Sequence, residues 1–178
     1  MRIISGKHRG RVLASFQGAE IRPTSDRVKE SLFSILSARI AGARVLDLFC
    51  GSGALGLECL SRGAKEVIFN DLSRESLALL KKNLALLKEQ AIVQNYDFET
   101  CLKRAEGKFD IIFIDPPYAQ QYCERALTLI YERQLLAEGG LVVYESERVA
   151  EVSPRGMVLQ DERSYGRTKL FFFGREEV

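Results

Sequence analysis

The stretch that decides the fold is DLFCGSGALGLE, residues 47–58. Its glycines at 51, 53 and 56 fit the pattern G-x-G-x-x-G, with an apolar run before the pattern and a helix-forming run after it. Asp71 closes the next apolar run, 20 residues after Gly51. In such units the loop approaches a nucleotide and the acid holds ribose hydroxyls. The stretch therefore predicts a site for a ligand that contains a nucleoside.

Three classes of nucleotide ligand compete for this loop. A P-loop for nucleoside triphosphates needs a lysine after the last glycine, and Leu57 stands there. A dinucleotide would place its pyrophosphate at the helix N-terminus, which Asp47 opposes by its charge. S-adenosylmethionine carries an ammonium and a sulfonium group and no phosphate, so the sign of Asp47 favours it over NAD. Asp97 ends the third apolar run and is placed to accept from an adenine amino group, with Phe98 beside the ring; Asp97 also suits a helix N-cap.

The rhythm of apolar runs outward from this loop indicates a parallel sheet. Five short runs lie at 43–49, 65–71, 91–97, 109–115 and 139–146, and helical stretches separate them. Strands that alternate with helices predict parallel pairing, because a parallel connection needs a long crossover. The clearest helix is 73–89, in which one stripe contains four leucines: Leu77, Leu80, Leu84 and Leu87.

The two ends of the chain depart from this rhythm. Residues 157–174 read as two strands joined at Tyr165-Gly166, which predicts an antiparallel hairpin at the edge of the sheet. Residues 1–22 contain short strand-like pieces between glycines, which predicts a hairpin or extension on a single domain of residues 1–178. Next comes an expected helix capped by Thr24, Ser25 or Asp26. Its apolar positions have helical spacing: Val28, Leu32, Ile35, Leu36 and Ile40.

Charge is distributed unevenly along the chain. The formal net charge is +2, yet residues 1–22 hold five cations against Glu20, a net of +4. This distribution fits either a phosphate-rich partner or a solvated charged face. The cations of this segment are Arg2, Lys7, Arg9, Arg11 and Arg22, with His8 among them.

Composition excludes several function classes. The four cysteines form no C-x-x-C pair, so we expect buried free thiols and no metal site. The single histidine, His8, leaves no Ser-His-Asp triad and no histidine-based metal centre. No apolar run approaches the length of a membrane span, and the first residues lack the apolar core of a secretory signal. A cytoplasmic protein is the simplest expectation.

The run DIIFIDPPYAQ, residues 110–120, ends a strand with an acid, two prolines and an aromatic. Pro116 and Pro117 lack N–H groups and have fixed φ angles, so neither a strand nor a helix continues through them. The Asp115 carboxylate and the Pro116 carbonyl can accept the two hydrogens of an exocyclic amine, while Tyr118 offers a stacking face. This arrangement predicts transfer to a nucleobase amine through positioning and electrostatics, with the base flipped from its helix. A purely structural Pro-Pro turn is the alternative.

These motifs carry a resemblance to a known family. DPPY after DLFCGSG resembles the class I S-adenosylmethionine-dependent methyltransferases that modify exocyclic amines of adenine, cytosine or guanine. RIISGKHRGRVL with IRPTSDRVKESLFSIL resembles the N-terminal signature of the bacterial 16S rRNA (guanine-N2)-methyltransferase RsmD family, and ERSYGRTKLFFF is similar to its closing hairpin. The resemblance covers essentially the whole chain.

The resemblance implies a Rossmann-like class I methyltransferase fold, with a mostly parallel seven-stranded sheet, an antiparallel edge hairpin and helices on both faces. It implies methyl transfer from S-adenosylmethionine to N2 of one guanine in 16S rRNA, leaving S-adenosylhomocysteine. The partner would be a partly or fully assembled small subunit, and the enzyme a monomer.

Each motif position then receives an expected role. The catalytic loop is Asp115, Pro116, Pro117 and Tyr118. The cofactor contacts are Asp47, Phe49, Gly51, Ser52, Gly53, Asp71, Leu72, Asp97 and Phe98. The RNA contacts are Arg2, Lys7, His8, Arg9, Arg11, Arg22, Thr24 and Arg27.

Some alternatives stay open at this stage. An amino-methyltransferase for adenine N6 in RNA or DNA shares both central motifs. An NAD-dependent oxidoreductase and a non-catalytic RNA-binding module are rivals from other classes. Asn70 precedes Asp71, so which of the two meets the ribose is unresolved, although a carboxylate accepts from both hydroxyls.

Overall fold

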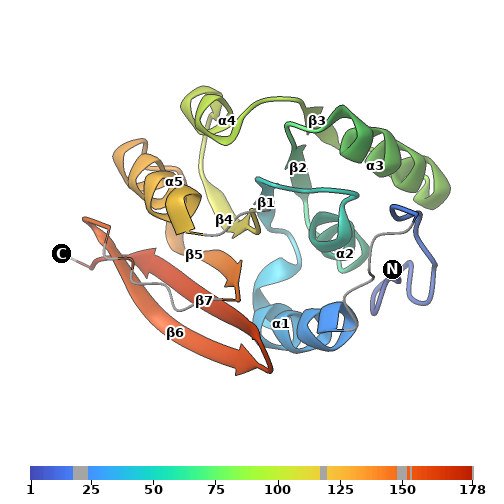
Figure 1. Cartoon of the computed structure of the whole chain (residues 1–178), viewed down its shortest axis with the longest axis horizontal. Helices are drawn as coiled ribbons and strands as arrows, with labels where there is room; N and C mark the ends of the chain where they lie inside the picture. The colour runs from blue at the N-terminus through green and yellow to red at the C-terminus, as the bar shows by residue number, and fades with distance from the viewer. Residues whose placement is uncertain (18–23, 117–119, 148–151, 153, 178) are drawn as a thin grey trace.

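The computed structural model describes residues 1–17, 24–116, 120–147, 152 and 154–177 (Figure 1). The side chains of residues 24–25 and 120–121 are outside this description. The helices, in chain order, are α1 (Thr24–Ile40), α2 (Ala54–Ser61), α3 (Arg74–Leu87), α4 (Phe98–Arg104) and α5 (Gln120–Glu132). The strands are β1 (Arg44–Asp47), β2 (Glu66–Asn70), β3 (Ile92–Gln94), β4 (Phe109–Ile114), β5 (Leu136–Ser146), β6 (Met157–Tyr165) and β7 (Thr168–Arg175).

The strands form one seven-stranded sheet in the order β3-β2-β1-β4-β5-β7-β6. Strands β1 to β5 pair in parallel, β7 pairs antiparallel with β5, and β6 pairs antiparallel with β7. The parallel sheet and the edge hairpin predicted from the sequence are both confirmed. Because the parallel strands point the same way, their carboxyl ends meet at one edge of the sheet.

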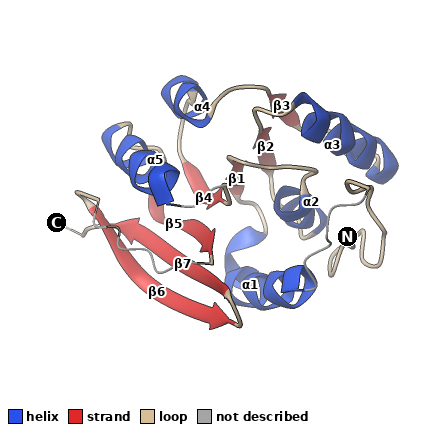
Figure 2. Cartoon of the chain, in the orientation of Figure 1, coloured by secondary structure: helices blue, strands red, loops and turns tan. Residues whose placement is uncertain are grey.

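Alternation along the strands divides the core into two layers, one on each face of the sheet (Figure 2). In β4, Ile111 and Phe113 pack with residues of α1, α2 and α3. Their neighbours Ile112 and Ile114 pack with residues of α4 and α5. Both faces are covered by helices, which is why the central runs are apolar at nearly every position.

The helical predictions hold with two corrections. All four leucines of the α3 stripe are buried. In α1, Ile35 is 36% exposed, so it lies at the margin of the apolar stripe and not within it. The helix begins at Thr24, so Thr24, Ser25 and Asp26 all lie in its first turn and none occupies the cap position before it.

Close approach of α2 to the sheet depends on glycine. A Cβ at Gly56 would lie 2.3 Å from Cε1 of Phe69 in β2. A Cβ at Gly53 would lie 2.5 Å from Leu80, and the φ of 97° at Gly53 also favours glycine. The two glycines therefore let α2 pack directly on β2 and beneath α3.

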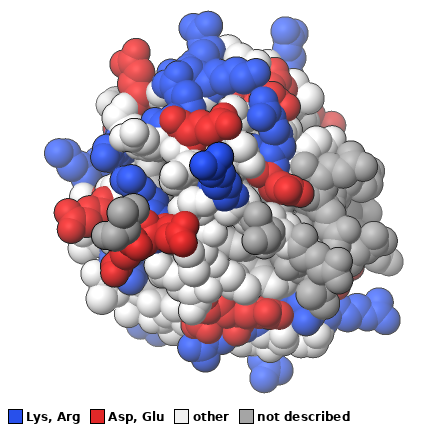
Figure 3. Space-filling view, turned by 90° about the vertical axis from the view of Figure 1, so that its left-hand side faces the viewer, with Lys and Arg blue, Asp and Glu red and all other residues white. Residues whose placement is uncertain are grey.

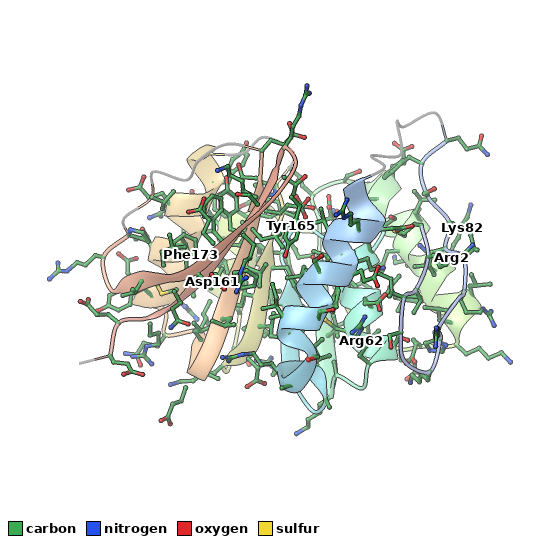
Figure 4. The ribbon with its side chains drawn as sticks, turned by 90° about the horizontal axis from the view of Figure 1, so that it is seen from below. Arg2, Arg62, Lys82, Asp161, Tyr165 and Phe173 are labelled. Carbon is green, nitrogen blue, oxygen red and sulfur yellow. The ribbon has the colours of Figure 1, made fainter. Side chains whose placement is uncertain are left out.

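The N-terminal segment, residues 1–17, folds back on itself and packs on α2 and α3. It makes one antiparallel bridge, between Arg2 and Val12, so the expected hairpin is present in reduced form. Asn83 of α3 exchanges two hydrogen bonds with the backbone of Ala14. Figure 4 shows Arg2 on the same side of the molecule as Lys82 of α3, opposite the β6–β7 hairpin.

A buried ionic network anchors this segment. Both carboxylate oxygens of Glu58 in α2 accept from backbone N–H groups, one from Ile4 and one from Ser5, each at 3.0 Å. The same carboxylate lies 3.1 Å from Nζ of Lys29 and 2.9 Å from Nε of Arg62. The Glu58 side chain is fully buried, so these four partners replace the water it loses on folding. Lys29 also donates to the Arg2 carbonyl.

The four cysteines, Cys50, Cys59, Cys101 and Cys123, are buried free thiols, as predicted. Among the described helices, none combines the length and the apolar character that crossing a membrane requires.

The Glu58 network generates a stability prediction. Glu58→Gln removes the charge that pairs with Lys29 and Arg62 and leaves Lys29 buried without its counter-ion. We expect a loss of about 3 kcal/mol in the free energy of unfolding, measured by urea denaturation. The matched change Glu99→Gln affects an exposed carboxylate that pairs with Lys103 and Arg125, and we expect little effect there. Equal losses for the two variants would contradict the assigned role of Glu58.

Candidate functional site

A cavity of about 1140 Å³ opens at the carboxyl edge of the parallel sheet. Its walls follow the strand ends in turn, because residues just beyond β1, β2, β3, β4 and β5 all line it. This is the edge at which ligands bind in open α/β sheets. The volume exceeds what one medium-sized ligand fills, so the cavity can take two ligand groups side by side. Helix α1 and the N-terminal segment complete the wall with Phe16, Val28, Lys29 and Leu32.

The glycine loop and Asp71 form the floor beside β1 and β2. The Gly51 N–H donates to Oδ2 of Asp71 at 2.8 Å, and the Ser73 N–H donates to Oδ1 at 2.8 Å. Asp71 is half-buried and lines the cavity. These bonds hold its carboxylate at the cavity wall, and each oxygen retains a further lone pair for a ligand hydroxyl.

The side chain of Asn70 is hydrogen-bonded to backbone groups. Its amide donates to the carbonyls of Leu48 and Tyr96, and its side-chain oxygen accepts from the Tyr96 N–H. The residue is 1% exposed, so its polar atoms serve to tie β2 to the loops after β1 and β3. Both Asn70 and Asp71 line the cavity, but the amide of Asn70 is buried and bonded to backbone groups, whereas the Asp71 carboxylate is only half-buried.

Asp47 lies beneath the glycine loop and not among the lining residues. It is 2% exposed, and its Oδ2 accepts from the Gly56 N–H at 3.0 Å, inside the first turn of α2. Burial raises the pKa of Asp47 to about 7, with a smaller contribution from the Asp71 charge, while the Gly56 N–H opposes the shift. Gly53 is likewise absent from the cavity wall, whereas Gly51 and Ser52 line it.

An aromatic cluster closes the end of the cavity next to β3. Phe98 lies 5.7 Å from Phe49 and 5.2 Å from Tyr122, measured between ring centroids. Asp97 caps α4 by accepting from the Thr100 N–H and hydroxyl, and these bonds lower the pKa of Asp97. The cap predicted for Asp97 is confirmed, and its exposed carboxylate still borders the cavity. Leu72, 70% exposed, also lines the cavity.

The lining is strongly acidic. Among the described residues that line the cavity, Lys29 is the only cation, and its Nζ already bonds the Arg2 carbonyl and Glu58. The acids that line it are Asp71, Asp97, Asp115, Glu145 and Glu147. Such a surface attracts a cationic ligand and repels a pyrophosphate. The sequence predicted that the charge of Asp47 would favour a cationic ligand over a pyrophosphate. In the structure, that preference comes mainly from these five carboxylates.

The structure brings the predicted catalytic positions to this cavity as far as it describes them. Asp115 follows β4 directly and lines the cavity, and Pro116 beside it is buried. Pro117 and Tyr118 lie outside the described residues. Sequence reasoning missed Phe16, Lys29, Tyr96, Tyr122, Glu145, Ser146 and Glu147. Only the glutamates carried a usable signal, since they end a strand as Asp115 does.

The predicted RNA-contact residues fall into two groups. Lys7 and His8 both contact Glu89, and Arg11 donates to the Leu86 carbonyl, so these three are engaged with the C-terminal end of α3. The Lys7 N–H also bonds Ser61 at the end of α2, which places the turn that contains Arg9 at the edge opposite the cavity.

The remaining RNA-contact predictions lie nearer to the cavity. Arg27 is exposed in the first turn of α1, directly before the lining residues Val28 and Lys29. Arg2 is exposed on the bridge with Val12. Arg22 and the Thr24 side chain lie outside the described part of the chain.

Comparisons with known proteins add three kinds of likeness. A family model described as conserved hypothetical protein 95 matches residues 1–174. The chain is 42% identical to YlbH of Bacillus subtilis, provisionally described as an rRNA methyltransferase, over 97% of this chain and 98% of that protein. It is 40% identical to the ribosomal RNA small subunit methyltransferase D of Haemophilus influenzae, over 93% and 89%. The solved structure of the Escherichia coli methyltransferase candidate yhhF has a TM-score of 0.87 at 34% identity, covering 100% and 99%.

The buried carboxyl of Asp47 generates a pH prediction. Its folded pKa is raised, so the native state keeps a proton that the unfolded chain releases near pH 4. The contribution of Asp47 to stability therefore falls as pH rises from about 4 to about 7, by on the order of 4 kcal/mol. Asp47→Asn removes this slope, because an amide does not titrate but still accepts from the Gly56 N–H. Urea denaturation at pH 4.5 and 8 measures both proteins, and identical pH slopes would refute the assignment.

Proposed function

This chain belongs to the conserved hypothetical protein 95 family, the RsmD family, and from that premise we propose that it methylates ribosomal RNA of the small subunit with S-adenosylmethionine. Membership in this family confirms the resemblance found in the sequence. The relative from Haemophilus influenzae is described as acting on small-subunit ribosomal RNA. For this chain the proposal rests most directly on one observation, the acidic lining of the cavity.

The acidic lining selects among nucleoside-containing ligands. NAD would place two phosphates among five carboxylates, and Lys29, the single cation among the described lining residues, is already engaged. S-adenosylmethionine presents an ammonium and a sulfonium to the same surface, so the electrostatic energy has the opposite sign. The Gly56 N–H at the start of α2 is also committed to Asp47, which removes a donor that a pyrophosphate would use.

The described lining residues offer a suitable partner for each group of S-adenosylmethionine. Asp71 would accept from the ribose hydroxyls, Asp97 from the adenine amino group, and the rings of Phe49 and Phe98 would contact the adenine faces. The cofactor supplies an activated methyl group. The cationic end would lie toward Asp115, at the other end of the acidic wall.

Asp115 and Pro116 prepare the target amine. An exocyclic amine is a poor nucleophile because its lone pair is delocalised into the ring. Hydrogen bonds from its two hydrogens to the Asp115 carboxylate and the Pro116 carbonyl would favour a tetrahedral nitrogen whose lone pair is directed at the methyl group. Tyr118 would stack on the flipped base. Transfer is direct and in line, without a covalent intermediate on the protein.

The finer assignment is N2 of one guanine in 16S rRNA, in a partly or fully assembled small subunit. The choice of guanine is supported by the N-terminal signature of the chain, and the description of the relatives supports small-subunit ribosomal RNA as the substrate. We expect the enzyme to act as a monomer in the cytoplasm. The alternative is an amino-methyltransferase for adenine N6, which would use the same cofactor and the same turn.

RNA phosphates would be held around the mouth of the cavity by exposed cations, among them Arg27 and Arg2. Figure 3 shows a different character on the side of α5 and the hairpin, where basic and acidic side chains lie beside each other. On the β6–β7 hairpin, Arg163 pairs with Asp161, and Lys169 lies 3.5 Å from Glu162. The phosphate contacts are therefore assigned to the side of α1 and the N-terminal segment.

The catalytic assignment is tested with Asp115→Ala. We expect loss of at least about 1,000-fold in the transfer rate, since a positioned acceptor for the amine is removed. Labelled S-adenosylmethionine and small subunits from a methylation-deficient strain give the rate, and nucleoside analysis should identify N2-methylguanine. Calorimetry should show unchanged affinity for S-adenosylhomocysteine.

Asp161→Ala, a change on the outer hairpin, should keep normal activity. Near-normal turnover by the Asp115 variant would refute the catalytic role. Binding of NAD in place of S-adenosylhomocysteine would refute the cofactor, and N6-methyladenine as product would refute the base.

The proposed phosphate contacts are tested with two arginine variants at opposite ends of α1. Arg27→Gln, at the end of α1 next to the cavity, should weaken binding to the small subunit and reduce the slope of log affinity against log salt by about 0.7–0.9. Arg39→Gln lies in the last turn of the same helix, where Arg39 donates to the Gly139 carbonyl at the opposite edge of the sheet. Filter binding from 50 to 300 mM salt should separate the two variants. Parallel salt curves for Arg27→Gln and the wild type would exclude the contact.

A further inference from the structure

The carboxyl end of β5 forms a wall of the cavity that the proposed chemistry does not use. Its sequence is YESE, residues 144–147, and Glu145, Ser146 and Glu147 all line the cavity. We propose that Glu145 is the residue that selects guanine, by accepting the N1–H of the base whose N2 amine is held by Asp115. This inference rests on the proposed function and assigns the recognition of the base within the same site.

Strand register places Glu145 next to Asp115. Strands β4 and β5 are parallel neighbours, and Ile114 pairs with Tyr144. The residues that follow this pair are Asp115 and Glu145. Adjacent strands lie about 4.8 Å apart, so two carboxylates at successive strand ends can reach neighbouring atoms of one base.

Alternation sets the face from which Glu145 acts. Ile114 and Tyr144 belong to the layer under α4 and α5, so the next residue on each chain turns to the α1 side. The antiparallel partner of Glu145 on β7 is Leu170, and Leu170 packs in the layer under α1. Glu145 and Asp115 thus share the face that Val28, Lys29 and Leu32 cover.

The chemistry of nucleobase amines makes a neighbouring carboxylate selective. Beside its N6 amine, adenine presents N1, a hydrogen-bond acceptor. Beside its N4 amine, cytosine presents N3, also an acceptor. Guanine presents a donor, N1–H, beside its N2 amine. A carboxylate is acceptor-only when ionised, so Glu145 would pair with guanine and repel the lone pairs of the other two bases.

The surroundings of Glu145 make the binding of a base other than guanine less favourable. The α1 side of the cavity wall contains Val28 and Leu32, and Glu145 itself is only half-exposed. A bound base would exclude water from this end, and an acceptor facing an acceptor would then remain unsatisfied. Sites that hydrogen-bond a substrate group reject analogues lacking that group far more strongly than apolar pockets do. The same Glu145 contact would exclude adenine from a turn that otherwise accepts any exocyclic amine.

The test removes the group from which Glu145 is proposed to accept, the N1–H of guanine. Once the methylated guanine has been mapped, small subunits are reconstituted from 16S rRNA that carries guanine or 2-aminopurine at that position. The analogue keeps the 2-amino group, has an acceptor at N1 and lacks the O6 carbonyl of guanine. Comparison of the wild type with the Glu145 variant therefore separates the effect at N1 from the loss of O6. The wild type should methylate guanine at least about 100-fold faster than 2-aminopurine. Glu145→Gln should reduce this preference to less than about 10-fold, with a higher absolute rate on the analogue, because an amide donates as well as accepts.

A second readout does not depend on turnover. The fluorescence of 2-aminopurine rises when the base leaves its stack, so titration in the presence of S-adenosylhomocysteine reports entry of the base. Glu145→Gln should give this rise at a lower protein concentration than the wild type, and its affinity for S-adenosylhomocysteine should stay within twofold. Glu162→Gln is the matched control on the outer hairpin and should behave as the wild type in every measurement.

The outcomes separate this inference from the proposed function. A wild type that methylates no small-subunit RNA would overturn the proposed function itself. A wild type that forms N2-methylguanine but uses both bases at similar rates would overturn the role of Glu145, without reference to any variant. A preference for guanine that survives in Glu145→Gln would also overturn it.

Discussion

The contact between Gly56 and the ring of Phe69 sets how closely α2 lies on the sheet, and much of the structure depends on that closeness. A side chain at position 56 would collide with the ring at 2.3 Å. With glycine there, the first turn of α2 lies over the end of β1 and its N–H bonds Asp47. The loop before the helix is then held against Asp71, which forms the floor of the cavity. One turn further along, Glu58 anchors the N-terminal segment.

The electrostatics of the site work on two scales. Inside the cavity, carboxylates at the ends of β2, β3, β4 and β5 surround the position of a small cationic ligand. Outside it, exposed arginines near the start of α1 and on the N-terminal segment suit a polyanion. In the proposed reaction the two fields would be compatible, because a flipped base would enter the cavity alone while its phosphates stayed at the rim. A site for a phosphate-bearing cofactor would need the opposite sign inside.

The N-terminal segment is an integral part of this arrangement. Phe16 lines the cavity, and the Arg2 carbonyl takes one hydrogen of Lys29, which is otherwise paired with Glu58. The segment that carries much of the positive charge is therefore joined to the same buried network as the α1 wall. Lys7 and His8, which the sequence suggested for RNA, bind Glu89 and hold the turn of the segment against α3. These contacts give both side chains a part in holding the fold together.

Local patterns by themselves determined a large part of this protein. The strand–loop–helix unit around residues 47–58, the parallel order of the central strands and the edge hairpin were all readable, because alternation and glycine spacing act over a few residues. The same holds for Asp71, Asp97 and Asp115 as strand-end acids that reach one cavity. Parallel strands bring their ends to one edge whatever the details of packing.

Only the tertiary structure decided which charges meet. It placed Asp47 beneath the loop, joined Lys29 to Glu58 across 29 positions and set Glu145 beside Asp115. It also committed Asn70 to backbone groups and left Asp71 at the cavity wall. Strand order and the packing of α1 depend on contacts between residues far apart in the chain. A charged residue looks the same in sequence whether its partner is water, a buried lysine or a bound base, and packing alone makes that choice.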